Sequence, residues 1–219
     1  MREMVSDIVL QVGLMLLLAF IFLLMHNIPQ KALSYLQTLR SRSQTQAKRH
    51  FVRGAQLLSQ AQALAAKDQT AAAFSLAKSA ADEADRAISL DAKDAAAHIL
   101  KALAFEIQGY RTSALDSLDA ALSPMAARSL TKEERSDALL KRAELKVALG
   151  AKERVDSAIA DLVESVRLKD DNAKAYIVLG ECYEMKGMAE AARKAYEDAL
   201  RVEPRAAVAR EAVERLGSS

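Results

Sequence analysis

The chain has three histidines and one cysteine, which are side chains that commonly bind metals or act as nucleophiles. His26, His50 and His98 lie in separate segments and lack the short spacing that places two ligands on one metal ion. Cys182 adjoins Tyr183 in a helical pattern, and no neighbour there would lower the pKa of its thiol. We therefore predict no metal site, no disulfide within these residues, and a packed, unreactive thiol.

Sequence motifs for catalysis are missing as well. The chain has no glycine-rich phosphate loop, no G-x-S-x-G and no H-E-x-x-H. The acid pairs Glu133-Glu134 and Asp170-Asp171 lie at predicted helix ends, where solvation and capping explain them. No aromatic platform or motif favours nucleic-acid binding. We predict that the chain is not an enzyme, needs no cofactor and binds no nucleic acid.

The composition favours helices that pack closely. The 219 residues are 51% hydrophobic and 27% charged, alanine is very common, proline (3) and glycine (7) are rare, and tryptophan is absent. Small side chains let helix backbones approach one another. The charge is uneven: seven basic and two acidic residues give residues 1–60 a charge of +5, which leaves −3 for the rest of a chain with net charge +2. The two parts are therefore expected to have different surroundings.

Residues 173–204 show the helical pattern most clearly. Apolar and small residues recur three or four apart on either side of Gly187, which predicts two helices packed by one face each. Pro204 ends the second helix because it cannot donate the next hydrogen bond. The pattern is made by Tyr176, Leu179, Gly180, Tyr183, Ala192, Tyr196, Ala199 and Pro204.

This segment resembles the tetratricopeptide repeat (TPR), whose 34-residue pattern has these residue types at these offsets. Earlier repeats are indicated by alanines at the second-helix position, with Ala80 and Ala114 one repeat length apart and Ala158 and Ala192 likewise. The step between the two pairs is ten residues longer, which predicts an inserted loop at 123–135 that ends in a capping box at Thr131. Aligning Gly150 with Gly187 predicts three further loop residues.

An apolar run at residues 8–25 predicts a membrane-spanning helix. The run has only Gln11 as a polar residue and would be about 27 Å long as a helix. A cleaved signal peptide fits less well, because the preceding residues are not basic and no small-x-small cleavage site follows. Basic residues follow the run, so the positive-inside rule places the N-terminus outside and the C-terminal domain in the cytosol. These residues are Lys31, Arg40, Arg42, Lys48, Arg49 and Arg53.

The predicted architecture is thus all-α: a TPR-type α-solenoid of helical hairpins preceded by a single N-terminal transmembrane helix. The expected segments are an anchor at 1–28, a basic stalk helix at 29–50 and a TPR-like domain at 51–216, with the last repeat at 173–206 and a capping helix at 205–216. The membrane is either the endoplasmic reticulum or the mitochondrial outer membrane. The six basic residues either contact anionic lipid or only set the topology.

The resemblance implies a concave groove that binds a protein or peptide partner. Its first-helix positions would carry Ile99, Leu100, Leu103, Ile107, Leu140, Lys141, Glu144, Lys174, Ile177, Val178 and Glu181. Some TPR domains hold the carboxylate of heat-shock chaperones with a Lys and Asn clamp. This clamp is absent from two repeats, because Ile99 and Leu103 occupy the matching positions in one repeat and Ile177 and Glu181 in the last. An equal alternative is that the stalk helix fills the apolar end of this groove.

These features favour a membrane-anchored TPR adaptor or scaffold. There are two alternatives: a receptor or assembly factor for organelle protein import, and a structural subunit of a larger membrane complex.

Overall fold

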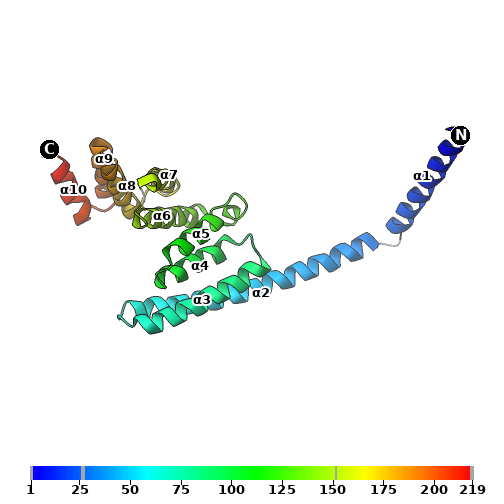
Figure 1. The fold of residues 1–219 in the computed structure, drawn as a ribbon, viewed down its shortest axis with the longest axis horizontal. Coiled ribbons are helices and arrows are strands. Elements are labelled where there is room, and N and C mark those ends of the chain that lie inside the picture. Colours follow the sequence, from blue (N-terminus) through cyan, green and yellow to red (C-terminus); the bar gives the residue numbers. More distant parts are fainter. Residues whose placement is uncertain (1, 26–27, 151, 218–219) are drawn as a thin grey trace. The chain divides into compact units, whose positions relative to one another are not determined.

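The computed structural model describes residues 2–25, 28–150 and 152–217, and the side chains of residues 11–22, 41–150 and 154–217. Within these residues the chain forms ten α-helices, one short 3-10 turn and no β-strand (Figure 1). The helices are α1 (Arg2–Met25), α2 (Ile28–Ala65), α3 (Thr70–Leu90), α4 (Ala95–Ile107), α5 (Arg111–Ala121), α6 (Lys132–Ala148), α7 (Lys152–Leu168), α8 (Ala173–Met185), α9 (Ala189–Val202) and α10 (Ala207–Gly217).

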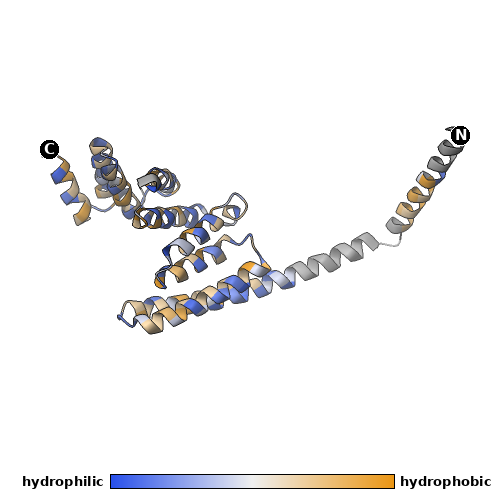
Figure 2. Ribbon diagram, viewed as in Figure 1, coloured by the Kyte–Doolittle hydropathy of each residue, from blue (hydrophilic) through white to orange (hydrophobic). Residues whose placement is uncertain are grey.

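The chain divides into two units, residues 1–46 and residues 47–219. The first unit contains α1, in which residues 12–22 include no polar side chain (Figure 2) and are all exposed. Within the described residues, none of the helices carries an apolar stretch long enough to cross a membrane. His26 lies outside the described residues.

The second unit is a row of helical hairpins. The last part of α2 packs on α3 through Leu58, Ala80 and Ala84, and three further pairs follow, α4 with α5, α6 with α7, and α8 with α9. Each pair also packs on the next one, and α10 covers the outer side of α9. The predicted stack of helical hairpins is therefore the observed fold.

Glycines make the tight turns inside three of the hairpins. Gly109, Gly150 and Gly187 all have positive φ, between 72° and 80°. Glycine adopts this left-handed backbone conformation readily, whereas residues with a Cβ atom are strained in it. In the first hairpin Asp68 takes this conformation instead, with φ of 57°. The recurrence of one conformation at successive turns keeps the hairpins alike.

Small residues set the distance between the helices of the last hairpin. A Cβ atom on Gly180 would lie 2.7 Å from the ring of Tyr196, so only glycine fits on α8 at this crossing. Tyr196 is buried, and its hydroxyl donates a hydrogen bond to Glu184 (2.7 Å). Tyr176 is buried in the same cluster and Tyr183 lies at its edge. The packing role predicted for these tyrosines is confirmed.

The ten additional residues between Ala114 and Ala158 do not simply form the loop that was predicted at 123–135. Part of this length is the 3-10 turn Ala127–Ser129, and part is an extra first turn of α6, which has 17 residues where α4 and α8 have 13. The capping box predicted at Thr131 is present. The three extra residues expected in a loop after Gly150 instead lengthen α7, which has 17 residues against 14 in α9. That prediction was wrong because helix length varies between these repeats.

Polar contacts also hold α6 against its neighbours. Nε and Nη2 of Arg142 donate to the two carboxylate oxygens of Asp161 on α7, at 2.9 and 2.5 Å, and Nζ of Lys146 donates to the same carboxylate at 2.7 Å. Nη1 of Arg142 also reaches Asp119 on α5 (3.0 Å). Asp161 is buried, with 8% of its side chain exposed, whereas 53% of the Asp119 side chain is exposed.

Replacing Asp161 should destabilise the domain much more than replacing Asp119. We expect Asp161→Ala to lower the free energy of unfolding by about 3 kcal/mol, because Arg142 and Lys146 are left as poorly solvated cations without their acceptor. Asp119→Ala should cost less than about 1 kcal/mol, since its carboxylate is exposed. Urea unfolding followed by circular dichroism measures both. Equal losses in the two variants would contradict this account of the network.

Candidate functional site

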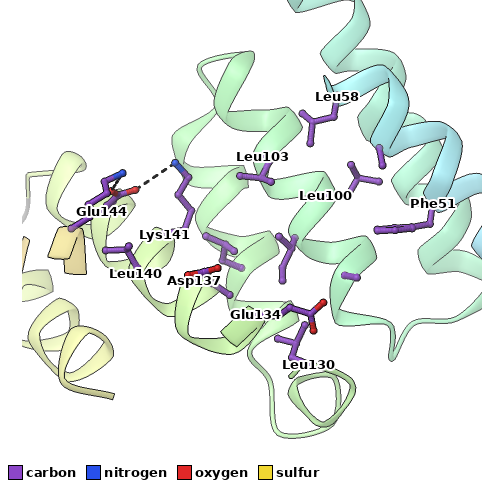
Figure 3. A pocket seen from close by; sticks show the side chains of 16 residues that line it. Phe51, Leu58, Leu100, Leu103, Leu130, Glu134, Asp137, Leu140, Lys141 and Glu144 are labelled. Carbon is purple, nitrogen blue, oxygen red and sulfur yellow. Dashed lines mark ion pairs between the residues drawn. The ribbon is translucent and has the colours of Figure 1, made fainter. Parts of the chain in front are cut away.

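The second unit contains a groove of about 520 Å³ between its helices (Figure 3). The first helices of successive hairpins, α2, α4, α6 and α8, all contribute to its lining. Apolar side chains of α2 and α4 lie at one end, and the charged pair Lys141 and Glu144 lies at the other (Figure 3). The lining residues are Phe51, Ala55, Leu58, Ala96, Ile99, Leu100, Leu103, Leu118, Leu130, Glu134, Asp137, Ala138, Leu140, Lys141, Glu144 and Lys174.

A buried carboxylate fixes the wall that α2 contributes. Glu83 of α3, with only 4% exposed, accepts hydrogen bonds from Nδ1 of His50 (2.6 Å) and Nη1 of Arg86 (2.8 Å). Gly54 lies beside it, and a Cβ atom there would lie 2.8 Å from Leu100 of α4. The hydrogen bond from His50 is the main reason that the pKa of Glu83 lies below its ordinary value, with Arg86 and Arg53 adding to it against the effect of burial. This contact holds Phe51 at the groove.

The inserted segment before α6 forms another part of the wall. Its alanines, Ala126 and Ala127, are buried, and Ala126 packs with Ala95 at the start of α4. The hydroxyl of Ser129 accepts a hydrogen bond from the backbone N–H of Ala95 (3.2 Å), one of the N–H groups that an α-helix leaves free at its start. Leu130 follows and reaches the groove. The insertion is therefore a packed element that completes the site.

The first turns of α6 place two carboxylates at the groove. Thr131 and Glu134 form the capping box: the Thr131 hydroxyl accepts from the Glu134 N–H (3.2 Å), and the Glu134 carboxylate accepts from the Thr131 N–H (2.8 Å). Asp137 lies one turn further along and is exposed. The cation nearest to it, Lys169, is 3.8 Å away.

A row of ion pairs links three first helices at the charged end. Nζ of Lys141 on α6 lies 2.9 Å from Glu106 of α4 and 3.4 Å from Glu144, and Nζ of Lys174 on α8 lies 2.6 Å from Glu144. Burial alone would lower the pKa of Lys141. The hydrogen bond and charge of Glu106, with Glu144 adding to them, raise that pKa above its ordinary value. Lys141 is thus a fixed cation.

Seven of the eleven residues predicted from the sequence line the groove: Ile99, Leu100, Leu103, Leu140, Lys141, Glu144 and Lys174. The four others lie elsewhere. Ile107 packs on the core between α2 and α4, Val178 is buried against α6 and α7, and Ile177 packs near Tyr176. Glu181 is exposed on α8, and its pKa is raised by partial loss of solvent and by repulsion from Glu184 and Glu144.

The groove positions predicted from the sequence left out the residues of α2 and of the insertion, and only the alternative in which the stalk helix fills the apolar end brought that helix to the groove. Phe51, Ala55 and Leu58 of α2 line the groove, as do Leu130 and Asp137. The spacing of Phe51, Ala55 and Leu58, four and three apart, showed that they share one helix face. Their sequence could not show which neighbour that face would meet.

The residues considered for metal binding or catalysis do not come together. Within the described side chains, no group of three or more His, Cys, Asp and Glu residues is arranged to hold a metal ion. His50 is engaged with Glu83, and Nε2 of His98 lies 3.1 Å from the carbonyl of Ala92. Cys182 is buried, and this burial raises the pKa of its thiol to about 11. The predicted packed thiol is confirmed.

Solved structures with this arrangement of helices include known TPR proteins. MamA from Desulfovibrio magneticus RS-1 has a TM-score of 0.58, with 14% identity over 76% of this chain and 84% of that one. YrrB, described as a TPR protein with an unusual peptide-binding site, has a TM-score of 0.53, with 20% identity over 74% of this chain and 75% of that one. The first TPR of Spaghetti (RPAP3), bound to an HSP90 peptide, has a TM-score of 0.50, with 22% identity over 58% of this chain and 94% of that one.

No family model matches the chain, and no curated protein matches it. The likeness to solved structures establishes that the second unit has the TPR fold. TPR is therefore the class of fold that positions the groove.

The contact between His50 and Glu83 should make stability depend on acid pH. Because the pKa of Glu83 is lower in the folded chain than its ordinary value of 4.5, its stabilising effect is present above that pH and is lost as pH falls further. Glu83→Gln should reduce the free energy of unfolding by about 1 kcal/mol at pH 7. The difference between wild type and variant should shrink below about pH 4.5. Urea unfolding at several pH values measures it, and a constant difference would contradict this explanation.

Proposed function

We propose that this chain is a TPR scaffold that binds a peptide segment of a partner protein in the groove of its second unit. The groove itself is the observation that carries the proposal. Its side chains at one end are apolar and only half-buried, notably Phe51, Ile99 and Leu103, and such concave apolar surfaces suit a peptide with apolar anchors. YrrB and RPAP3, which share the fold, are described with a peptide-binding site and a bound peptide, respectively. We propose no catalytic role.

Charge in the floor of the groove should abolish partner binding. The double variant Ile99→Asp plus Leu103→Asp places two carboxylates where an apolar anchor would lie, and burying an unpaired charge is strongly unfavourable. We expect loss of at least about 90% of captured partner, since about 1.4 kcal/mol is a tenfold change in affinity. Pull-down with the full chain, followed by mass spectrometry, measures the captured proteins.

The matched control is Val163→Asp plus Val208→Asp. These valines are 45% and 55% exposed on α7 and α10, and neither lines the groove. A milder groove variant, Leu130→Gln, introduces no charge at a side chain that is only half-buried. Circular dichroism checks that each variant is folded. A folded groove variant that retains every partner would contradict the proposal.

We also propose that residues 8–25 anchor the chain in a membrane. The described side chains of α1 include Met15 and Leu16, which are 75% and 67% exposed, and a dense run of exposed apolar side chains needs an apolar covering. In the sequence this run extends beyond the described side chains on both sides. The basic residues after it support an N-terminus outside and the second unit in the cytosol. Either the endoplasmic reticulum or the mitochondrial outer membrane fits this topology.

The basic residues themselves need bind no particular lipid. Where their side chains are described, Arg42, Lys48, Arg49 and Arg53 are exposed on α2, and Arg53 lies 3.6 Å from Glu83. The side chains of Lys31 and Arg40 lie outside the described residues. Contact with anionic lipid stays a prediction, and setting the topology is the simpler role.

Protease protection on separated organelles tests the anchor and its orientation. With a tag at each end of the full chain, we expect the C-terminal tag to be digested without detergent, because the second unit faces the cytosol in this proposal. The chain should also stay in the membrane pellet after alkaline carbonate extraction. Release by carbonate would refute the anchor, and a protected C-terminal tag would refute the orientation.

A further inference from the structure

The groove combines an apolar floor with an excess of negative charge. Three carboxylates line it, those of Glu134, Asp137 and Glu144, against the two ammonium groups of Lys141 and Lys174. Glu106, which holds Lys141 from α4, adds a fourth carboxylate at its edge. An occupant of this groove meets more anionic than cationic groups.

Both cations of the groove are already paired with carboxylates of the chain. Lys141 is held by Glu106 at 2.9 Å and by Glu144 at 3.4 Å, and Lys174 is held by Glu144 at 2.6 Å. An acidic ligand that recruited either lysine would first have to separate it from these partners. The charged end of the groove therefore offers little attraction to an anionic peptide.

Two of the carboxylates remain accessible. Glu134 and Asp137 are both exposed and line the groove, with Glu134 beside Leu130 (Figure 3). The described contacts of Glu134 are with the backbone of Thr131, and the nearest cation to Asp137 is Lys169 at 3.8 Å, close to the limit for an ion pair. Asp137 thus has one long ion pair and the Glu134 carboxylate has a backbone partner, and because both stay exposed each can also pair with a lysine or arginine from outside.

We infer that the groove binds an apolar peptide segment that carries lysine or arginine beside its apolar anchors. This inference rests on the proposed function and specifies its ligand. The apolar anchors lie against Ile99, Leu103 and Phe51, and the basic side chain pairs with Glu134 and Asp137. Such a ligand has the opposite charge from an acidic peptide of the heat-shock chaperone type. The absence of the Lys and Asn clamp agrees with this choice.

Three fluorescent peptides of equal length test the inference with the full chain in detergent. One carries leucines with lysines, the second carries the same leucines with glutamates, and the third keeps the lysines but has serines for leucines. We expect the leucine–lysine peptide to bind at least about tenfold more tightly than the other two in fluorescence polarisation. The HSP90 peptide SRMEEVD serves as a natural acidic probe and should bind more weakly as well.

The double variant Glu134→Gln plus Asp137→Asn removes the two available charges. Glutamine keeps the capping box, so the start of α6 is retained. We expect the preference for the leucine–lysine peptide over the leucine–glutamate peptide to fall by about tenfold. The control, Glu133→Gln plus Asp116→Asn, removes the same charge from exposed residues that do not line the groove. It should leave the preference within about twofold.

The outcomes separate this inference from the proposed function. If peptides bind and Ile99→Asp plus Leu103→Asp abolishes binding, but the acidic peptide binds as well as the basic one, the inference is wrong and the proposed function stands. The inference is also wrong if the variant at Glu134 and Asp137 and its control show the same preference for the leucine–lysine peptide over the leucine–glutamate peptide. If no peptide binds and no captured partner depends on Ile99 and Leu103, both fail.

Discussion

The close approach of helix backbones through small side chains is the constraint on which the second unit depends. Most of its buried positions on α3 and α4 are alanines, and at Gly180 even a Cβ atom would collide with the ring of Tyr196. Close packing of this kind tolerates few changes in volume. Because alanines fill the crossings, the large apolar side chains of α2 and α4 extend to the edge of the core. Phe51, Ile99 and Leu103 consequently face the groove.

Polar contacts decide which helices are neighbours within that alanine-rich core. Ser136 and Ser165 are fully buried, and each hydroxyl donates to the backbone carbonyl of the other residue, at 3.0 and 2.9 Å. Glu83 plays a similar part between α2 and α3, and Asp161 between α6 and α7. Buried polar groups are costly unless they are paired, so these contacts favour one register over others. The groove inherits its shape from that register.

The groove combines an apolar surface, which single helices provide, with a charged surface, which forms only where helices meet. Its apolar part follows from the faces of α2 and α4, whereas its charged end is formed by ion pairs between α4, α6 and α8. Lys141 was recognisable from the sequence as a groove residue, but its engagement by Glu106 was not. The pair Glu134 and Asp137 was recognisable only as part of a helix start. The basic partner that we propose follows from the combination.

The sequence by itself determined the helices, their turns and the repeat. Helical spacing of small and large residues, Gly187 between the two patterns and Pro204 after them are local signals, and each acts over one or two helical turns. Only the tertiary structure decided what lines the groove and which charges are paired there. Glu106 and Lys141 are 35 residues apart, and their contact at 2.9 Å exists because two hairpins stack. The repeat pattern did not reveal the added turn of α6 or the buried insertion, because their partners lie in other hairpins.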